Sequence, residues 1–208
     1  GDKAAARRAL GLDEAAPCIG IVATLRSWKG HHHLLEAFAA LDRPAWRLLI
    51  VGDGPRREYL QEMLARLGLE DRVRMVGHQD NAELWLKSLD VFCLPSYANE
   101  GVPQAILQAM LTGLPVVTTP VGSIAEVVTD GVTGLIVPPE QPQALTAALR
   151  RLIDEPALAA ALGEAARATA AARFGLAPML DAMERVFADA AGLAPEAHWK
   201  TTVDWVTE

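Results

Sequence analysis

Short apolar runs alternate along the chain with longer segments of helical period. The runs are rich in Val and Ile and about four to eight residues long, which is the usual length of a strand. They predict strands at 18–24, 46–51, 72–76, 90–94, 115–118 and 134–137. Apolar strands separated by helices are typical of a parallel sheet that is buried on both faces. The pattern therefore predicts the α/β fold class, as a doubly wound, Rossmann-like parallel sheet of about six strands.

The segments between these runs repeat apolar residues at intervals of three and four, as helices that pack on a sheet require. Leu34, Leu35, Phe38 and Leu41 show this spacing. The predicted helices cover 30–41, 55–67, 80–88, 103–112, 122–128, 141–153, 156–172 and 175–191. We expect one domain over residues 1–191 and a C-terminal tail over 192–208. The tail contains Trp199 and Trp205, which predicts that it docks on this domain or on a neighbouring one.

The composition indicates a folded, mildly acidic protein. Hydrophobic residues make up 51% and charged residues 22% of the 208 residues. This composition supports a full core and excludes a disordered chain. Residues 1–87 carry a net charge of +1 and residues 88–208 a net charge of −8. Neither half has the basic stripe that binds nucleic acid, so DNA and RNA are not expected as partners.

The cysteines and the hydropathy indicate the cellular setting. Cys18 and Cys93 lie inside apolar runs, where free cysteine behaves as a small buried hydrophobe. No apolar run approaches the ~20 residues that span a bilayer, and no signal peptide opens the sequence. We expect a reducing, cytoplasmic location and no integral membrane segment.

The loop after the first predicted strand holds the best candidate for a phosphate site. In open parallel sheets, ligands bind beyond the carboxyl ends of the strands. Thr24, Arg26 and Lys29 lie in this loop, just before a helix whose N-terminus favours an anion. The alternative is that Arg26 and Lys29 are solvated surface cations.

The loop after the fourth predicted strand places Glu100 just before a helix. Gln108 follows eight residues later, a spacing that can bring both polar side chains to one crevice. No Lys or Arg lies between Lys87 and Arg150, so a phosphate bound here would depend on backbone N–H groups. Gly122, after the fifth predicted strand, is expected to close the same pocket.

A nicotinamide or flavin site is not favoured. The turn Val51-Gly-Asp-Gly-Pro55 superficially resembles a dinucleotide fingerprint. Arg57 stands where the third glycine would be required, so Gly52 is better explained by a structural turn. Because it follows a strand, Gly52 is also a possible pocket residue, together with Thr24 and Gly122. The sequence also contains no G-x-S-x-G, H-E-x-x-H or P-loop motif, which excludes the usual hydrolase, metalloprotease and NTPase classes.

The histidines do not predict a metal site. His31, His32 and His33 are consecutive, and consecutive helical positions point about 100° apart, so one face cannot present all three to a metal. His78 follows the third predicted strand. It is explained equally well as a pocket residue or as an ordinary loop histidine.

A series of short motifs follows in a characteristic order between Ile19 and about Phe187. They are Leu25–Gly30, Val51–Pro55, Val73–Gly77, Asp90–Ser96, Glu100-Gly101, Ala109-Met110, Gly113–Thr118, Gly122, Glu126–Val128 and Gly131–Val137. The series resembles the family 4 retaining glycosyltransferases of GT-B fold, and specifically their C-terminal, nucleotide-sugar-binding half. The resemblance implies that an N-terminal, acceptor-binding domain of comparable size is missing from these 208 residues.

The resemblance implies binding of a nucleoside diphosphate sugar. It places Lys29 at the diphosphate and Glu100 at the hydroxyls of the donor sugar. It places backbone N–H groups at phosphate, near Gly101, Val102 and Gln104. His78 and its neighbours would lie near the base.

Three positions depart from the family pattern. Family members often carry Arg at the position of Thr24, so Arg26 would have to supply the second positive charge. The second Glu of the family's Glu-x7-Glu pair, expected on the ribose hydroxyls, is Gln108, a weaker partner by about 1 kcal/mol. Pro103 replaces a frequent glycine and removes one N–H. These departures bear on donor affinity and identity and leave the predicted fold unchanged.

For the parent enzyme, the resemblance implies transfer of a hexose, with retention, to a glycan or lipid-linked acceptor, as in bacterial polysaccharide or lipopolysaccharide synthesis. It implies no cofactor and no metal, and it assigns no catalytic residue in this half. The chain alone is expected to bind donor with little or no transfer. The full-length protein is expected to be cytoplasmic or peripheral at the inner membrane face.

Two other functions stay open at this point. One is half of a sugar-nucleotide epimerase, and the other is a non-catalytic binding module with a decayed donor site. We expect Lys29→Ala and Glu100→Ala to weaken donor binding and to leave the stability of the unliganded domain nearly unchanged.

Overall fold

The predicted parallel sheet is present in the computed structural model, which describes residues 2–192. Its six strands are β1 (Cys18–Val22), β2 (Arg47–Val51), β3 (Val73–Gly77), β4 (Val91–Leu94), β5 (Val116–Thr118) and β6 (Leu135–Ile136). All neighbours pair in parallel, in the order β3-β2-β1-β4-β5-β6. The α/β, doubly wound prediction is confirmed, and each predicted strand overlaps an observed one.

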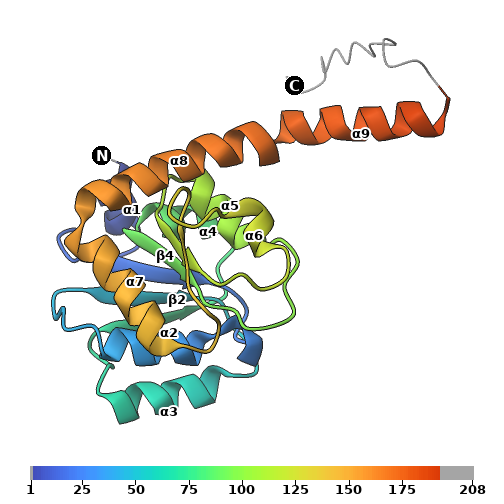
Figure 1. The fold of residues 1–208 in the computed structure, drawn as a ribbon. Coiled ribbons are helices and arrows are strands. Elements are labelled where there is room, and N and C mark those ends of the chain that lie inside the picture. The colour runs from blue at the N-terminus through green and yellow to red at the C-terminus, as the bar shows by residue number, and fades with distance from the viewer. Residues whose placement is uncertain (1, 193–208) are drawn as a thin grey trace. The chain divides into compact units, whose positions relative to one another are not determined.

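Helices cover both faces of the sheet (Figure 1). The helix α2 packs against α3 and α7 on one face, whereas α4 packs against α1 and α5 on the other. The bounds are α1 (Asp2–Ala9), α2 (His31–Ala39), α3 (Arg57–Leu67), α4 (Ala82–Lys87), α5 (Gln104–Leu111), α6 (Ile124–Val127), α7 (Pro142–Asp154), α8 (Pro156–Phe174) and α9 (Leu176–Ala190). A short 3-10 turn, η1 (Ser27–Lys29), precedes α2.

The strand order reverses between β1 and β4, which are neighbours at the centre of the sheet. The chain leaves β1 toward β2 and β3 on one side and leaves β4 toward β5 and β6 on the other. In a doubly wound sheet, the loops that follow these two strands diverge and leave a crevice at the carboxyl edge. The loops after β1 and β4, which contain the candidate residues, therefore lie where a ligand is expected to bind.

The core is continuous and apolar. The strands β1, β2, β4 and β5 consist almost entirely of buried residues, as their unbroken apolar sequences predicted. Cys18 and Cys93 are buried free thiols, as predicted, and burial raises the pKa of both. On the α8 side, a Cβ at Gly163 would lie 2.2 Å from the carbonyl oxygen of Gly113. Only glycine allows α8 to pack this closely on the turn after α5.

The helix α1 was not predicted, because its position depends on tertiary contacts. Arg7 is buried, and its guanidinium donates to the Asp90 carboxylate at 2.6 Å and to the Ser88 carbonyl at 2.9 Å. Asp90 also accepts from the Cys18 N–H at 2.7 Å and from Lys3 at 2.6 Å. One carboxylate therefore joins α1 to the starts of β1 and β4.

The chain divides into two compact units, Gly1–Ala171 and Ala172–Glu208. The division falls inside α8. In the second unit, α9 exposes apolar residues at helical spacing: Leu176, Met179, Leu180, Met183, Val186 and Phe187. Of the predicted tail, Trp199 and Trp205 lie outside the described residues.

Candidate functional site

The loops that follow β1, β2, β4 and β5 are joined at the carboxyl edge of the sheet. The Leu25 N–H donates to the Asp53 carbonyl at 3.0 Å, which joins the β1 and β2 loops. The Tyr97 N–H donates to the Trp28 carbonyl at 2.8 Å, which joins the β4 loop to the β1 loop. The Ser123 N–H donates to the Gly101 carbonyl at 3.3 Å. These bonds hold the candidate residues on one connected surface.

Two glycines allow the loops to approach this closely. Gly30 has φ +74°, and a Cβ there would lie 2.0 Å from the Pro95 carbonyl oxygen. Gly122 has φ +60°, and its Cβ would lie 1.9 Å from the Glu100 carbonyl oxygen. Any other residue would have both an unfavourable backbone and a clash with backbone atoms. Gly122 thus supports Glu100 through close contact with its backbone.

Lys29 and Glu100, 71 positions apart in sequence, form an ion pair at this edge. The Lys29 Nζ donates to both Glu100 oxygens, at 2.7 and 2.9 Å. The Glu100 side chain is only 4% exposed and that of Lys29 18%. Water therefore screens this pair less than it screens surface pairs such as Arg8–Glu14.

Ser96 is a site residue that the sequence analysis did not single out. It is fully buried, and its hydroxyl donates to Glu100 Oε1 at 2.6 Å. The Ser96 carbonyl accepts in turn from the buried Thr119 hydroxyl. The sequence did contain a sign of this role, because Ser96 ends the Asp90–Ser96 motif and lies only four residues before Glu100. The contact depends on the turn between them, which the sequence does not specify.

The other candidates of the β1 loop are more exposed. Thr24 and Arg26 are both exposed, and the Arg26 guanidinium lies 5.7 Å from the centre of the Trp28 ring. No ion pair joins Arg26 to another residue of the described part of the chain. Gly52 is packed against the segment after β1, since a Cβ there would lie 2.0 Å from the Ala23 carbonyl oxygen. Gly52 therefore acts at least as a close-packing joint between loops.

The start of α5 presents backbone N–H groups beside Glu100. Within residues 2–192, the N–H groups of Gly101, Val102 and Gln104 donate no hydrogen bond. Pro103 is the residue before the helix and has no N–H to leave unpaired. Free N–H groups at a helix start carry partial positive charge, which favours an anion in a stretch without basic residues.

Gln108 lies on an exposed face of α5, beside α4. It shares a groove of about 430 Å³ with Asp80, Asn81, Glu83 and Lys87, the segment that follows β3 and His78. Within the described chain, no hydrogen bond joins Gln108 to Glu100. Gln108 also lines a second groove, of about 960 Å³, so it lies between the neighbours of His78 and that groove. His78 itself has a 79% exposed side chain and lies 3.4 Å from the Asp80 carboxylate.

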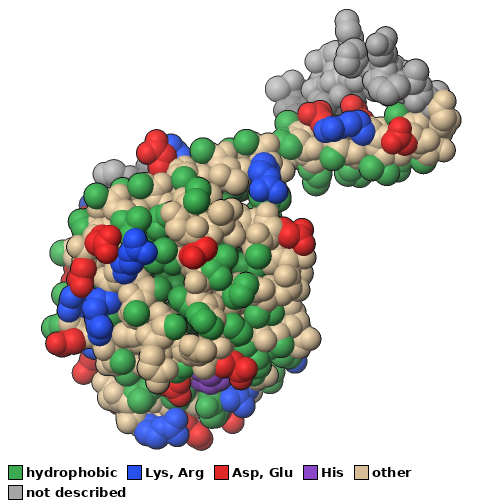
Figure 2. All heavy atoms as spheres, in the orientation of Figure 1, with side chains coloured by type: hydrophobic (Ala, Val, Ile, Leu, Met, Phe, Trp, Pro, Cys, Tyr) green, Lys and Arg blue, Asp and Glu red, His purple; other side chains and the backbone are tan. Residues whose placement is uncertain are grey.

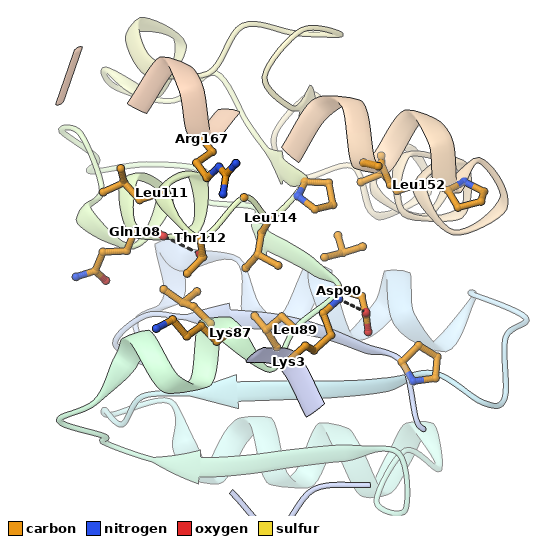
Figure 3. A pocket seen from close by; sticks show the side chains of 18 of the residues that line it. Lys3, Lys87, Leu89, Asp90, Gln108, Leu111, Thr112, Leu114, Leu152 and Arg167 are labelled. Carbon is orange, nitrogen blue, oxygen red and sulfur yellow. Dashed lines mark hydrogen bonds and ion pairs between the residues drawn. The ribbon is translucent and has the colours of Figure 1, made fainter. Parts of the chain in front are cut away.

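A groove of about 960 Å³ lies at the opposite edge of the sheet (Figure 3). Pro17, Trp46, Asp90 and Pro115 line it, and each directly precedes a strand. Lys3 and Asp90, two of its charged residues, are paired with each other at 2.6 Å (Figure 3). Because ligands of doubly wound sheets bind at the carboxyl ends of strands, the loops around Lys29 and Glu100 remain the candidate site.

The histidine cluster packs as an aromatic group. The rings of His32 and His33 have centroids 3.9 Å apart, and both contact the Tyr97 ring edge-on, at 5.9 and 5.8 Å. Among residues 2–192, no group of three or more His, Cys, Asp or Glu side chains is placed to hold a metal ion. The cluster instead fixes the β4 loop against α2.

His31 predicts a pH dependence of stability. Burial, then the neighbouring charges of His32 and Lys29, lower the pKa of His31 to about 3, with partial opposition from the Arg26 carbonyl. The unfolded chain binds this proton near pH 6.5 and the folded chain does not, so stability is lost as pH falls below about 6.5. At pH 5 this amounts to about 2 kcal/mol.

In urea unfolding at pH 7.5 and 5.0, His31→Gln should therefore reduce the loss of stability on acidification by about 2 kcal/mol. His78→Gln, which removes an exposed imidazole, is the matched control. Equal acid sensitivity in wild type and His31→Gln would contradict the buried, neutral state of His31.

Gly122 predicts a second, local effect. Gly122→Ala should lower the free energy of unfolding by about 2 kcal/mol, because it combines a left-handed backbone with a clash against Glu100. Gly131→Ala is the control, since Gly131 has φ +70° but a Cβ there would meet no other atom within 4 Å. It should cost only about 1 kcal/mol. Equal losses in the two variants would show that close approach to Glu100 contributes nothing.

Charged side chains of both signs are mixed on the face of the molecule that Figure 2 shows. Acidic and basic groups are interspersed there rather than segregated, so this face presents no continuous basic surface of the kind that binds nucleic acid. No helix within the described residues is long and apolar enough to cross a bilayer.

Comparison of sequences identifies relatives that match along most of this chain. The family model for glycosyl transferases group 1 matches residues 2–169. A lipopolysaccharide core biosynthesis mannosyltransferase, LpsB of Rhizobium meliloti, is 38% identical over 170 residues, which cover 77% of this chain and 48% of that protein. A D-inositol 3-phosphate glycosyltransferase of Corynebacterium urealyticum is 39% identical over 163 residues, covering 72% of this chain and 38% of that one. The chain thus spans about half or less of these relatives.

Comparison with solved structures likewise matches this chain to about half of a longer protein. HepE from Anabaena, solved in complex with UDP-glucose, matches with a TM-score of 0.83 and 28% identity over 90% of this chain and 52% of its own. The separately solved C-terminal domain of a group 1 glycosyl transferase from Francisella tularensis has the same fold, with a TM-score of 0.75 and 21% identity. That match covers 84% of this chain and 93% of that domain. Family model, relatives and fold together show that this chain belongs to the group 1 glycosyl transferases and corresponds to the C-terminal, Rossmann-like half of a GT-B enzyme.

Proposed function

We propose that the chain is the donor-binding half of a retaining glycosyltransferase. In this proposal it binds a nucleoside diphosphate sugar, and the complete enzyme transfers the sugar to a glycan or lipid-linked acceptor. The observation that carries the proposal is the Lys29–Glu100 pair, set beside free backbone N–H groups at the topological switch point of the sheet.

The diphosphate would bind between the β1 loop and the start of α5. Lys29 and Arg26 supply positive charge from one side, and the N–H groups of Gly101, Val102 and Gln104 supply hydrogen-bond donors from the other. Arg26 would supply the second positive charge, which the neutral Thr24 cannot. Arg26 is exposed, and no ion pair within the described residues engages it. This arrangement binds two phosphates despite the absence of Lys and Arg between Lys87 and Arg150.

The donor sugar would bind at Glu100. Its carboxylate is held by Ser96, and sugar hydroxyls would donate hydrogen bonds to it. The base and ribose would extend toward His78 and Gln108. The groove of Gln108, Asp80 and Asn81 is the hollow in that direction.

Catalysis in the complete enzyme would rest on electrostatic stabilisation of the leaving group. As the bond between sugar and diphosphate breaks, negative charge grows on the diphosphate oxygen. Lys29, Arg26 and the α5 N–H groups would surround the diphosphate, and their positive charge and hydrogen-bond donors would stabilise the charge that grows on it. The chemistry draws no nucleophile, cofactor or metal from this half, and the acceptor binds in the other half.

The names of two similar proteins bear on which donor the site binds. LpsB is named as a mannosyltransferase, and HepE was solved with UDP-glucose. These names make a hexose donor and a role in lipopolysaccharide or polysaccharide synthesis the leading expectation. They also make UDP the first nucleotide to test. We expect a cytoplasmic enzyme, or one peripheral at the inner membrane face, and little or no transfer by this half alone.

Calorimetric titration of the chain with UDP, GDP, ADP and NAD, each with and without Mg²⁺, tests the proposal. Saturable binding of one nucleoside diphosphate, independent of Mg²⁺, is expected. No binding across the panel, together with stable self-association, would instead favour a non-catalytic module. Binding of a nucleoside diphosphate favours both enzyme hypotheses, the glycosyltransferase and the epimerase, over the module.

A further inference from the structure

The Lys29–Glu100 pair raises a conflict within the proposed site. In the unliganded protein, both Glu100 oxygens already accept from Lys29. The same Lys29 is needed at the diphosphate, and the same Glu100 is needed at the sugar. A bound diphosphate and Glu100 therefore compete for one ammonium group.

The two partners differ in how firmly they are held. Glu100 is fixed by the Ser96 hydroxyl at 2.6 Å and by the backbone contact with Gly122, and its side chain is 4% exposed. The backbone of Lys29 is fixed by η1 and Gly30, but within residues 2–192 its ammonium group bonds to Glu100 alone. A four-carbon lysine side chain has many rotamers, so Lys29 is the partner that moves.

We propose that the donor sugar releases Lys29 from Glu100. This inference rests on the proposed function. Sugar hydroxyls donate to Glu100 in place of the ammonium group, so the carboxylate keeps its hydrogen bonds while Lys29 turns to the diphosphate. When the sugar has been transferred, Glu100 loses these donors and Lys29 returns to it. The pair thereby weakens binding of the nucleotide product relative to that of the donor.

Ser96 is the positioning residue in this exchange. Its hydroxyl occupies one lone pair of Glu100 Oε1 and holds the carboxylate at the sugar subsite. The Thr119 hydroxyl donates to the Ser96 carbonyl and fixes that residue in turn. Without this support, Glu100 could follow Lys29 toward the diphosphate, and the sugar and phosphate subsites would no longer be coupled.

The inference predicts an unusual gain of affinity. Glu100→Gln keeps the shape of the side chain but removes its charge, so Lys29 is no longer held. Affinity for pyrophosphate and for UDP should increase about three- to tenfold, the range expected for release of a partly buried ion pair. In the wild type, UDP-glucose should bind more tightly than UDP. In Glu100→Gln the ratio of the affinity for UDP-glucose to the affinity for UDP should fall to about one.

The experiment is calorimetric titration of wild type, Glu100→Gln and Glu14→Gln with pyrophosphate, UDP and UDP-glucose. Glu14→Gln removes a carboxylate from the exposed Arg8–Glu14 pair and makes the same change in net charge. It should change each affinity by less than about twofold, because distant surface charges are screened. Glu100→Ala serves as a second variant should the Gln variant fold poorly, which circular dichroism shows.

The possible outcomes separate the two proposals. Tighter pyrophosphate and UDP binding in Glu100→Gln, with loss of the UDP-glucose preference, supports the exchange. Unchanged or weaker pyrophosphate binding in both Glu100 variants overturns it, as does an absence of pyrophosphate binding in every variant. Tighter pyrophosphate and UDP binding in Glu100→Gln with an undiminished preference for UDP-glucose would overturn the release of Lys29 by the sugar and leave the proposed donor site in place.

Discussion

Lys29→Ala should reduce affinity for the nucleoside diphosphate by about ten- to a hundredfold, the usual worth of a charge-assisted hydrogen bond to phosphate. The structure adds a consequence that the sequence did not predict. Glu100 is 4% exposed, so removal of Lys29 leaves a buried carboxylate without its cation. The unliganded protein should therefore lose about 2 kcal/mol of stability. This revises the expectation that Lys29 and Glu100 can be replaced at no cost to the unliganded domain.

A double variant separates the binding role of Lys29 from its structural role. Lys29→Met combined with Glu100→Gln removes both charges, so stability should recover while nucleotide binding stays lost. Arg8→Ala, which breaks an exposed ion pair, is the control and should alter neither property appreciably. Calorimetry measures binding, and urea unfolding measures stability. Recovery of binding in the double variant would contradict the role of Lys29 at the diphosphate.

Asp90→Ala should be the most destabilising substitution considered, at about 3 kcal/mol of unfolding free energy. Arg7 would keep a buried guanidinium, 6% exposed, without its carboxylate. The Cys18 N–H would also lose its acceptor at the start of β1. Chemical unfolding followed by circular dichroism measures the loss.

Asp154→Ala is the matched control for Asp90. Asp154 also forms a 2.6 Å ion pair, with Arg43, but its side chain is 45% exposed. Its removal should cost less than about 1 kcal/mol. Losses of similar size in the two variants would contradict the conclusion that burial of Arg7, rather than the ion pair as such, makes α1 part of the fold.

The sheet could be predicted because its signal is local. Runs such as Cys18–Val22 and Val91–Leu94 are continuously apolar, and only a strand buried on both faces requires this over so short a length. The helix α1 could not be predicted in the same way. Its sequence, Asp-Lys-Ala-Ala-Ala-Arg-Arg-Ala, has no long apolar stripe, and its place depends on the bond from Arg7 to Asp90, 83 positions away.

In the candidate site, too, some features could be predicted from the sequence and others could not. Lys29 and Glu100 could be singled out from their motifs and from the loops in which they lie. Their direct contact could not, because it depends on how the β1 and β4 loops meet across Gly30 and Pro95. Ser96 was missed for a related reason, since a serine inside an apolar motif gives no sign of which carboxylate its hydroxyl will reach. The contacts of Glu100 with Lys29 and Ser96 depend on how distant loops pack together, and residue type alone does not reveal them.

The most direct test of a donor site at the carboxyl edge is a titration of the ¹⁵N-labelled chain with UDP, followed by amide chemical shifts. We predict that the largest changes occur at Lys29, Gly101, Val102 and Gln104. Leu89, Leu114 and Ala160, which line the groove at the opposite edge, should change little. Changes centred on those three residues, with the amides around Glu100 unaffected, would contradict the account.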